Sequence, residues 1–301
     1  MNIDKNNFET FLESINCCYA KDIAYKLPLA KDFQNDFFTN NNIDISKLET
    51  VVHKYQDVYK KSVALRLLAI LKFIERRDSN IEINIKEIWN LISKSILTIP
   101  KEAVISSIGS QGFLSIPLFK FDKDKNKFEF IRLHIWDKSL DKFINKNTCS
   151  NFSLHTHSFF AESWIICGEI INNRYRIIQT DKKTDNSLFT IGYNKSLNEI
   201  NQHTSIASNT NKFVEIKQIS SEKYFSDSNY SINAGNYHKS ISEGDNQLSA
   251  TLFSFIGKKG FVEQSYVVGP SNIQTSEINR KMYIDPTELI NNIIKKVNEN
   301  D

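Results

Sequence analysis

The chain has 301 residues, of which 40% are hydrophobic and 24% are charged, and its formal net charge is only +3. This composition is that of an ordinary folded protein, and the length allows one large domain or two modest ones. Because the lysines are scattered between acidic residues, we do not expect the protein to bind nucleic acid or an anionic membrane.

Neither a membrane span nor a secretion signal is apparent in the sequence. The aliphatic run at residues 67–71 is far shorter than the roughly 18 residues that a membrane helix needs. The first residues, MNIDKNNFETF, place acids and asparagines where a signal peptide has an apolar segment. The cysteines, Cys17, Cys18, Cys149 and Cys167, lack CxxC or disulfide-framework spacing. We therefore expect a cytoplasmic protein, in which Cys17 and Cys18 are small buried residues rather than a redox pair.

The glycines divide the chain into a helical part and a strand-rich part. All nine lie between Gly109 and Gly269. Tight turns need glycine and helix interiors disfavour it, so the first third is predicted to be helical. Residues 62–74 carry apolar side chains on more than one helical face, which is typical of a buried helix. Residues 85–97 repeat the helical pattern along one side, and Pro100 closes that helix.

Strand patterns begin after this proline. Residues 128–130 and 248–256 have the aromatic and aliphatic composition of strands. The sequence GKKG at residues 257–260 predicts a turn before a further strand over residues 261–268. Residues 286–294 predict a short amphipathic helix with Pro286 near its first turn. The expected fold class is therefore α+β, with a helical region over residues 1–100 and a C-terminal helix within residues 276–301.

The stretch NFSLHTHSFFAESWIICGE, residues 151–169, contains two histidines that are two positions apart. Residues at that spacing in a strand point to the same face, so His155 and His157 can share an ion. Glu162 follows five residues after the second histidine, and NAGNYH at residues 233–238 places His238 three residues after Gly235. The alternative interpretation is an exposed histidine pair and an unrelated histidine in a turn.

This pattern resembles the two motifs of the cupin superfamily, commonly G(x)5HxH(x)3-4E(x)6G and G(x)5PxG(x)2H(x)3N. The spacing of His155, His157 and Glu162 is that of germin-like cupins, and His238 matches the ligand of the second motif. The chain departs from both motifs, because a cysteine replaces the leading glycine, Glu162 stands one residue too close to the next glycine, and Asn233 replaces the proline. The resemblance covers residues 105–270 and leaves the first third unexplained.

The resemblance implies a fold and a metal site. The fold would be an antiparallel jelly-roll β-barrel over residues 105–275, with an insertion near residues 181–210 because the stretch between the motifs is long. The metal ligands would be His155, His157, Glu162 and His238. This nitrogen and oxygen donor set suits Fe(II), the expected ion, or alternatively Zn, Mn or Ni, and it leaves positions open for substrate or dioxygen.

Arg132, His134 and Tyr237 are further candidates for catalysis. Arg132, His134 and Trp136 alternate in RLHIW and therefore share a strand face. Arg132 could bind a substrate carboxylate, or it could be an ordinary surface cation. His134 could contact the substrate, or it could be a half-buried residue without a function. Tyr237 could supply a phenol near the metal.

The leading hypothesis is a mononuclear non-haem iron dioxygenase that acts on a small polar substrate, such as an amino acid or a thiol. Among cupins, the thiol dioxygenases combine an HxH pair with a later histidine, and Arg132 would suit their substrates. The alternatives are a non-redox metal-dependent isomerase or decarboxylase, and a non-enzymatic ligand sensor whose helical region binds a partner. A homodimer is a further expectation.

The hypotheses differ in whether Glu162 is a metal ligand. Five residues separate it from His157, and an odd number places it on the opposite face of a regular strand. A turn or bulge would have to restore it to the metal, as happens in germin-like cupins. We expect that turn here. Otherwise the site is a three-histidine face with three open positions.

Overall fold

The computed structural model describes residues 3–33, 36–109, 111–193, 204–242 and 248–299. The chain forms two compact units. The first contains Met1–Ile105, Pro117–Phe121 and Asp285–Asp301, and the second contains Ser106–Ile116 and Asp122–Ile284. Helices and mostly antiparallel strands make up the chain, which confirms the α+β class. The described helices include none that is long and apolar enough to cross a membrane.

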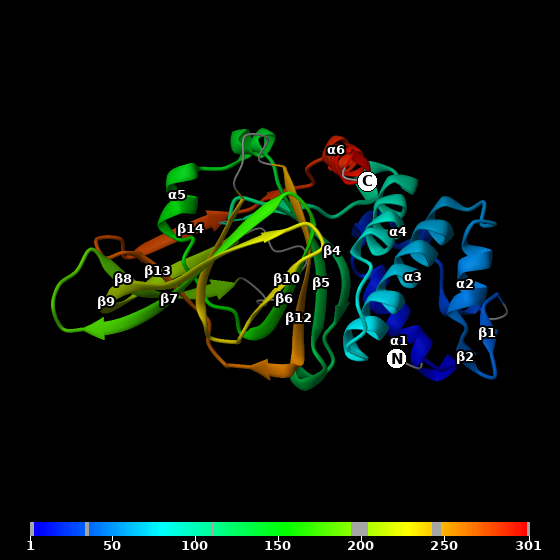
Figure 1. The fold of residues 1–301 in the computed structure, drawn as a ribbon, viewed down its shortest axis with the longest axis horizontal. Coiled ribbons are helices and arrows are strands. Elements are labelled where there is room, and N and C mark those ends of the chain that lie inside the picture. The colour runs from blue at the N-terminus through cyan, green and yellow to red at the C-terminus, as the bar shows by residue number, and fades with distance from the viewer. Residues whose placement is uncertain (1–2, 34–35, 110, 194–203, 243–247, 300–301) are drawn as a thin grey trace. The chain divides into compact units, whose positions relative to one another are not determined.

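The first unit is helical (Figure 1). Its elements are α1 (Lys5–Asn16), η1 (Lys21–Lys26), η2 (Ala30–Phe33), β1 (Phe38–Thr39), β2 (Asn42–Ile43), α2 (Ile45–Val52), α3 (Val58–Asp78), α4 (Ile85–Thr98), η3 (Lys101–Ala103) and α6 (Thr287–Glu299). Helices α1 to α4 begin after Asp4, Asp44, Asp57 and Asn84, whose side chains each accept a hydrogen bond from the backbone N–H three residues later. These caps satisfy backbone donors that would otherwise lack partners at the helix starts.

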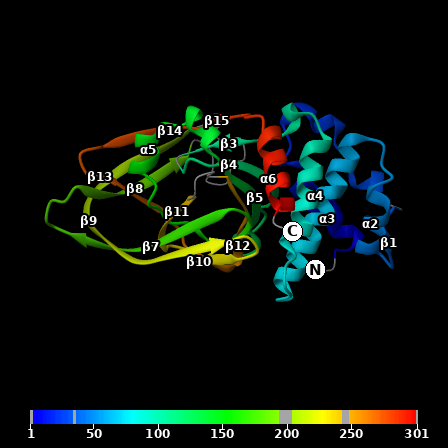
Figure 2. The ribbon, with the colours of Figure 1, turned by 45° about the horizontal axis from the view of Figure 1, so that its top comes forward.

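The predicted helices are confirmed in this unit. Residues 62–74 lie within α3, and all of them except Lys72 are buried, as expected for a helix inside a core. Helix α4 covers the second predicted range and ends before Pro100. Helix α6 begins directly after Pro286 and packs against α4 (Figure 2).

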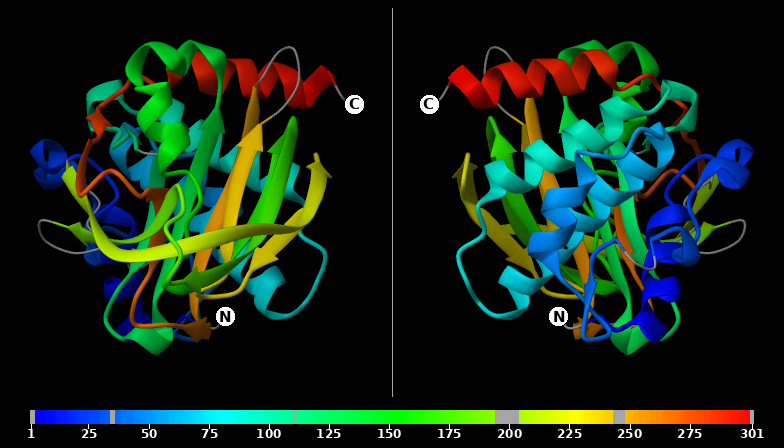
Figure 3. Two further views of the ribbon diagram at one scale, coloured as in Figure 1. Left: turned by 90° about the vertical axis from the view of Figure 1, so that its left-hand side faces the viewer. Right: turned by 90° about the vertical axis from the view of Figure 1, so that its right-hand side faces the viewer.

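The second unit is built from two sheets. The strand order of the seven-stranded sheet is β10-β6-β12-β5-β4-β3-β15, and Figure 3 shows β10, β6 and β12 side by side. These strands are β3 (Ser107–Ile108), β4 (Leu114–Phe121), β5 (Glu129–Trp136), β6 (Phe159–Cys167), β10 (Asn229–Ile232), β12 (Ser249–Phe261) and β15 (Lys281–Met282). The part of β4 from Pro117 to Phe121 is assigned to the first unit.

The second sheet has the order β11-β7-β9-β8-β13, and β14 pairs with β9. Its strands are β7 (Glu169–Thr180), β8 (Asn186–Tyr193), β9 (Thr204–Phe225), β11 (Tyr237–Ser242), β13 (Tyr266–Pro270) and β14 (Thr275–Asn279). Short helices η4 (Lys125–Lys127), η5 (Lys138–Phe143) and α5 (Lys146–Asn151) complete the unit.

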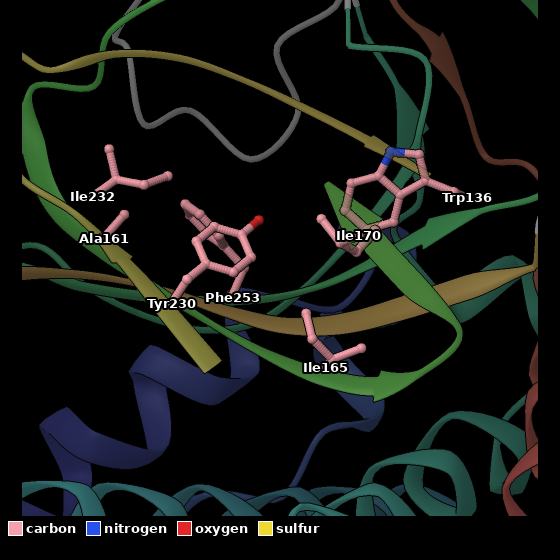
Figure 4. Packing of buried hydrophobic residues seen from close by; sticks show 7 residues of the cluster. All are labelled: Trp136, Ala161, Ile165, Ile170, Tyr230, Ile232 and Phe253. Carbon is pink, nitrogen blue, oxygen red and sulfur yellow. The ribbon is translucent and has the colours of Figure 1, made fainter. Parts of the chain in front are cut away.

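An apolar cluster joins the facing sides of the two sheets. It consists of Trp136, Ala161, Ile165, Ile170, Tyr230, Ile232 and Phe253, and Figure 4 shows these side chains gathered from β5, β6, β7, β10 and β12. The strand register explains why these side chains lie on one face. Phe253 of β12 lies opposite Arg132 of β5 and opposite Ser163 of β6. Directly paired residues share a face, so even-numbered residues of β5 and odd-numbered residues of β12 point toward the second sheet.

The structure supports the barrel prediction only in its coarser form. Over the described residues the sheets are antiparallel but are not closed into a barrel, so the jelly roll stays a prediction. The predicted turn at residues 257–260 is wrong, because these residues lie inside β12, where the register shifts. Of the predicted insertion, residues 181–193 and 204–210 belong to the β7-β8-β9 region, and residues 194–203 lie outside the described residues.

Candidate metal centre

The backbone brings three histidines that are distant in sequence into one place. His155 and His238 exchange backbone hydrogen bonds, with N···O distances of 3.1 and 3.0 Å. His155 also forms a bridge with Val267, so one residue contacts both β11 and β13, the edge strands of the second sheet. The N–H of Gly235 donates to the carbonyl of His157 at 2.9 Å. These bonds fix the His155–His157 segment beside the start of β11.

The imidazole nitrogens converge. Nε2 of His155 lies 3.0 Å from Nε2 of His157, and one ring nitrogen from each of these residues and His238 lies within 4.8 Å of the others. Metal–nitrogen bonds of about 2.1 Å at adjacent octahedral positions would separate two nitrogens by about 3.0 Å, which fits the His155–His157 pair. Within the described ranges, these three residues form the one group of side chains that could hold a metal ion.

Backbone carbonyls bind the Nδ1 atoms of two of the three histidines. Nδ1 of His155 donates to the carbonyl of Ser153 at 2.9 Å, and Nδ1 of His238 donates to the carbonyl of Asn236 at 3.3 Å. A proton on Nδ1 leaves Nε2 with its lone pair, which is the tautomer that binds a metal. His155 and His238 therefore keep the Nε2 lone pair free for a metal, whereas Nδ1 of His157 is buried without a hydrogen-bond partner.

Electrostatics keep these rings neutral. Burial lowers the pKa of His155 below its ordinary value of 6.5. Burial, together with the neighbouring histidines, lowers the pKa of His157 and of His238 further. A neutral imidazole is a metal ligand and an imidazolium is not, so the cluster is ready to bind an ion at neutral pH.

A cavity of about 190 Å³ lies beside the histidines, within the second unit. Its aromatic wall includes Phe253 and Phe255, whose ring centres lie 5.7 and 4.9 Å from that of His157. The guanidinium of Arg132 lies over the same two rings at 5.5 and 5.0 Å. This stacking holds Arg132 in the cavity wall near the metal ligands.

His134 also lines the cavity, as its position on the face of Arg132 predicted. Its ring lies 4.2 Å from that of Phe113 and 4.8 Å from that of Phe253. Burial, and next the charge of Arg132, lower its pKa well below 6.5. The catalytic roles of Arg132 and His134 stay predictions, but both side chains are where a substrate could meet them.

Glu162 does not join the histidines, and the turn expected to bring it there is not formed. Strand β6 is regular at this point, with Glu162 opposite Ser254 and with Ser163 opposite Phe253. Because Phe253 faces the cavity, Glu162 faces away from it. Its Oε1 accepts a hydrogen bond from Lys259 at 2.5 Å instead. The structure thus brings together three of the four predicted ligands.

Tyr237 is also directed away from the cavity. It packs against the cluster formed by Leu154, Leu188, Val214 and Val268, and burial raises its pKa to about 12. His238, the next residue in the strand, points to the opposite face. The prediction erred because alternation along β11 cannot direct two adjacent side chains to one site.

The residues of the cavity wall that the sequence did not indicate include Tyr230 and Arg280. The hydroxyls of Tyr230 and Ser240 lie 3.2 Å apart, and burial raises the pKa of the phenol. Ser240 follows His238 by two residues on the same strand face, which was the available signal. No local pattern marks Arg280, which reaches the cavity from the segment before β15.

Comparisons with known proteins give no family for this chain. Neither a scan against models of known protein families nor a search of curated protein sequences finds a match.

Proposed function

We propose that the protein is a metal-dependent oxygenase of the cupin type, in which His155, His157 and His238 hold one transition-metal ion. The observation that carries the proposal is the convergence of three neutral imidazoles within 4.8 Å beside a cavity. Imidazole ligands suit iron, copper, nickel and zinc, and we propose Fe(II). Antiparallel sheets and this cluster are compatible with a cupin.

The placement of Glu162 supports the three-histidine form of the site. Without a carboxylate ligand, His155, His157 and His238 would hold the ion, and the site could also accept a chelating substrate and dioxygen. When bound, a ferrous ion supplies the dioxygen chemistry that protein side chains lack. The protein's contribution is to hold the ligands, orient the substrate and exclude water.

Arg132 is proposed to position the substrate. Its guanidinium lies over the rings of Phe253 and Phe255, which also contact His157. A planar guanidinium binds a carboxylate through two parallel hydrogen bonds. A substrate held in this way, an amino acid or a thiol acid, would reach the metal with its other donor groups.

Phenylalanines and a tyrosine shape the rest of the site. Phe253 and Phe255 cover His157 and limit access of water to the ligands. Burial raises the pKa of Tyr230, so its phenol stays protonated and can donate a hydrogen bond to a ligand in the cavity. Its hydrogen bond with Ser240, which lies two residues after His238 in β11, holds the Tyr230 hydroxyl in place.

The experiment is reconstitution of the untagged protein with ferrous iron without oxygen, followed by nitric oxide as a dioxygen surrogate. We expect an electron paramagnetic resonance signal of a ferrous nitrosyl in the wild type and none in His155→Ala. His53→Ala is the matched control, since His53 is exposed on the helical unit. Oxygen uptake with L-cysteine and 3-mercaptopropionate then tests the substrate class.

Two results would contradict the proposal. If the wild type binds no iron, the metal assignment is wrong. If it binds iron but forms no nitrosyl and consumes no oxygen, the oxygenase assignment is wrong and the non-redox isomerase or decarboxylase is favoured.

A further inference from the structure

Three nitrogen-bearing side chains form a row along one wall of the cavity. Arg132, His134 and Trp136 occupy alternate positions of β5, share the face that points toward the second sheet, and all line the cavity. Alternate residues of a strand are about 6.7 Å apart, so the row spans about 13 Å. The metal ligands lie near its Arg132 end, since Arg132 and His157 contact the same two phenylalanine rings.

The far part of this row has buried nitrogens that are not hydrogen-bonded. Neither Nε1 of Trp136 nor Nε2 of His134 has a hydrogen-bond partner, and these residues are 9% and 4% exposed. Packing fixes both rings, because Phe113 lies 4.8 Å from Trp136 and 4.2 Å from His134. A buried donor without an acceptor costs free energy. The indole N–H of Trp136 is such a donor, and Nε2 of His134 is one in the tautomer that has its proton on Nε2. Both residues line the cavity, so a ligand there can supply the acceptor that the protein does not.

The charge of the wall indicates the nature of that acceptor. Two arginines, Arg132 and Arg280, and four histidines line the cavity. The lining side chains that the structure describes include no aspartate and no glutamate. The two arginines carry the positive charge of this lining, and that charge favours an anionic ligand.

We propose that the cavity binds a substrate with two oxyanionic groups, a short dicarboxylate or an oxo derivative of one. The first group lies at Arg132 beside the metal ligands, and this placement rests on the proposed function. The second group accepts hydrogen bonds from Nε1 of Trp136 and Nε2 of His134. Trp136 thereby selects diacids over monoacids.

The test is calorimetric titration of zinc-loaded and metal-free protein with malonate, succinate and glutarate, and with propionate, butyrate and pentanoate as length-matched monoacids. We expect at least one diacid to bind ten-fold or more tightly than its matched monoacid. Trp136→Phe, which keeps an aromatic ring and removes the N–H, should weaken that diacid about ten-fold and leave the monoacid unchanged.

Two further variants keep the test decisive. His134→Phe should preserve ring packing and also weaken the diacid alone. Trp164→Phe is the matched control, because Trp164 is 7% exposed on β6 and lies opposite Leu252, on the face turned away from the cavity. It should leave both classes of ligand unaffected.

Equal affinity for diacids and monoacids would overturn the inference. So would a loss in Trp136→Phe and His134→Phe that is the same for both classes. Failure of the proposed function is distinguishable, because it appears as absent metal or an absent nitrosyl. A diacid preference that depends on Trp136 would still be measurable in the metal-free protein and would support the second subsite.

Discussion

The two units fill their interiors in different ways. In the helical unit, α3 buries aliphatic side chains on several faces, and its buried Arg66 stacks on Tyr19 and donates to Ser95. In the unit of two sheets, the interior includes a cavity lined by four histidines and two arginines. Polar groups in an interior cost stability unless they are paired. The first interior is filled mainly by aliphatic side chains, whereas the second leaves a cavity, which is where we propose that a ligand binds.

The largest effect is expected from a core substitution in the helical unit, which should lower stability without changing metal binding. Leu68→Ala should reduce the free energy of unfolding by about 2 to 5 kcal/mol, because Leu68 is 1% exposed within α3 and its removal leaves a cavity. Urea denaturation followed by circular dichroism measures this loss. The folded variant should bind as much metal as the wild type. Loss of metal from fully folded Leu68→Ala would break the comparison between the units.

Acidification should lower the free energy of unfolding through the buried His134 in the unit of two sheets. Burial lowers the pKa of His134 well below the 6.5 of an unfolded chain. Below pH 6.5 the His134 side chain is protonated in the unfolded state but stays neutral in the folded state. The free energy of unfolding therefore keeps its full value above pH 6.5 and decreases as the pH falls toward the folded pKa. The loss approaches about 1.4 kcal/mol per pH unit for this histidine.

Urea denaturation of metal-free protein from pH 7.5 to pH 5.5 measures this dependence. His134→Phe should make it shallower, whereas His53→Ala should not, because His53 is exposed. A wild-type stability that rises on acidification through this range would show that the buried histidines do not stay neutral.

The smallest effect is expected for Glu162→Gln, which tests whether Glu162 is a metal ligand. Glu162→Gln should leave metal affinity within two-fold of the wild type, because β6 directs this side chain away from the histidines. Loss of its ion pair with Lys259, a partly exposed group, should cost about 1 kcal/mol or less. Competition with a chelating dye measures the affinity. A ten-fold weakening would restore Glu162 as a ligand.

The sequence predicted those parts of the fold in which one strong local pattern decides the outcome. Helices α3, α4 and α6 follow from apolar spacing and from Pro100 and Pro286. The GKKG turn failed because pairing with neighbouring strands holds this segment inside β12 despite its glycines. Closure of the sheets depends on contacts between residues far apart in the chain, which no local pattern contains.

The site was predictable where spacing alone decides direction. His155 and His157 converge as their spacing predicted, although both lie before β6 and only His155 forms β-bridges, and a family motif indicated His238. For Glu162 the alternation rule was correct, and the turn borrowed from the motif was not formed. Tyr230 reaches the cavity through its pairing with Ser163, a long-range register that spacing does not contain.

The most direct test of the three-histidine site is the metal content of untagged protein purified without chelators, measured by inductively coupled plasma mass spectrometry. We expect about one transition-metal ion per wild-type chain. We expect the same content in His53→Ala and almost none in His155→Ala/His157→Ala, with all three proteins folded by circular dichroism. Equal metal content in the wild type and the double variant would contradict the central claim.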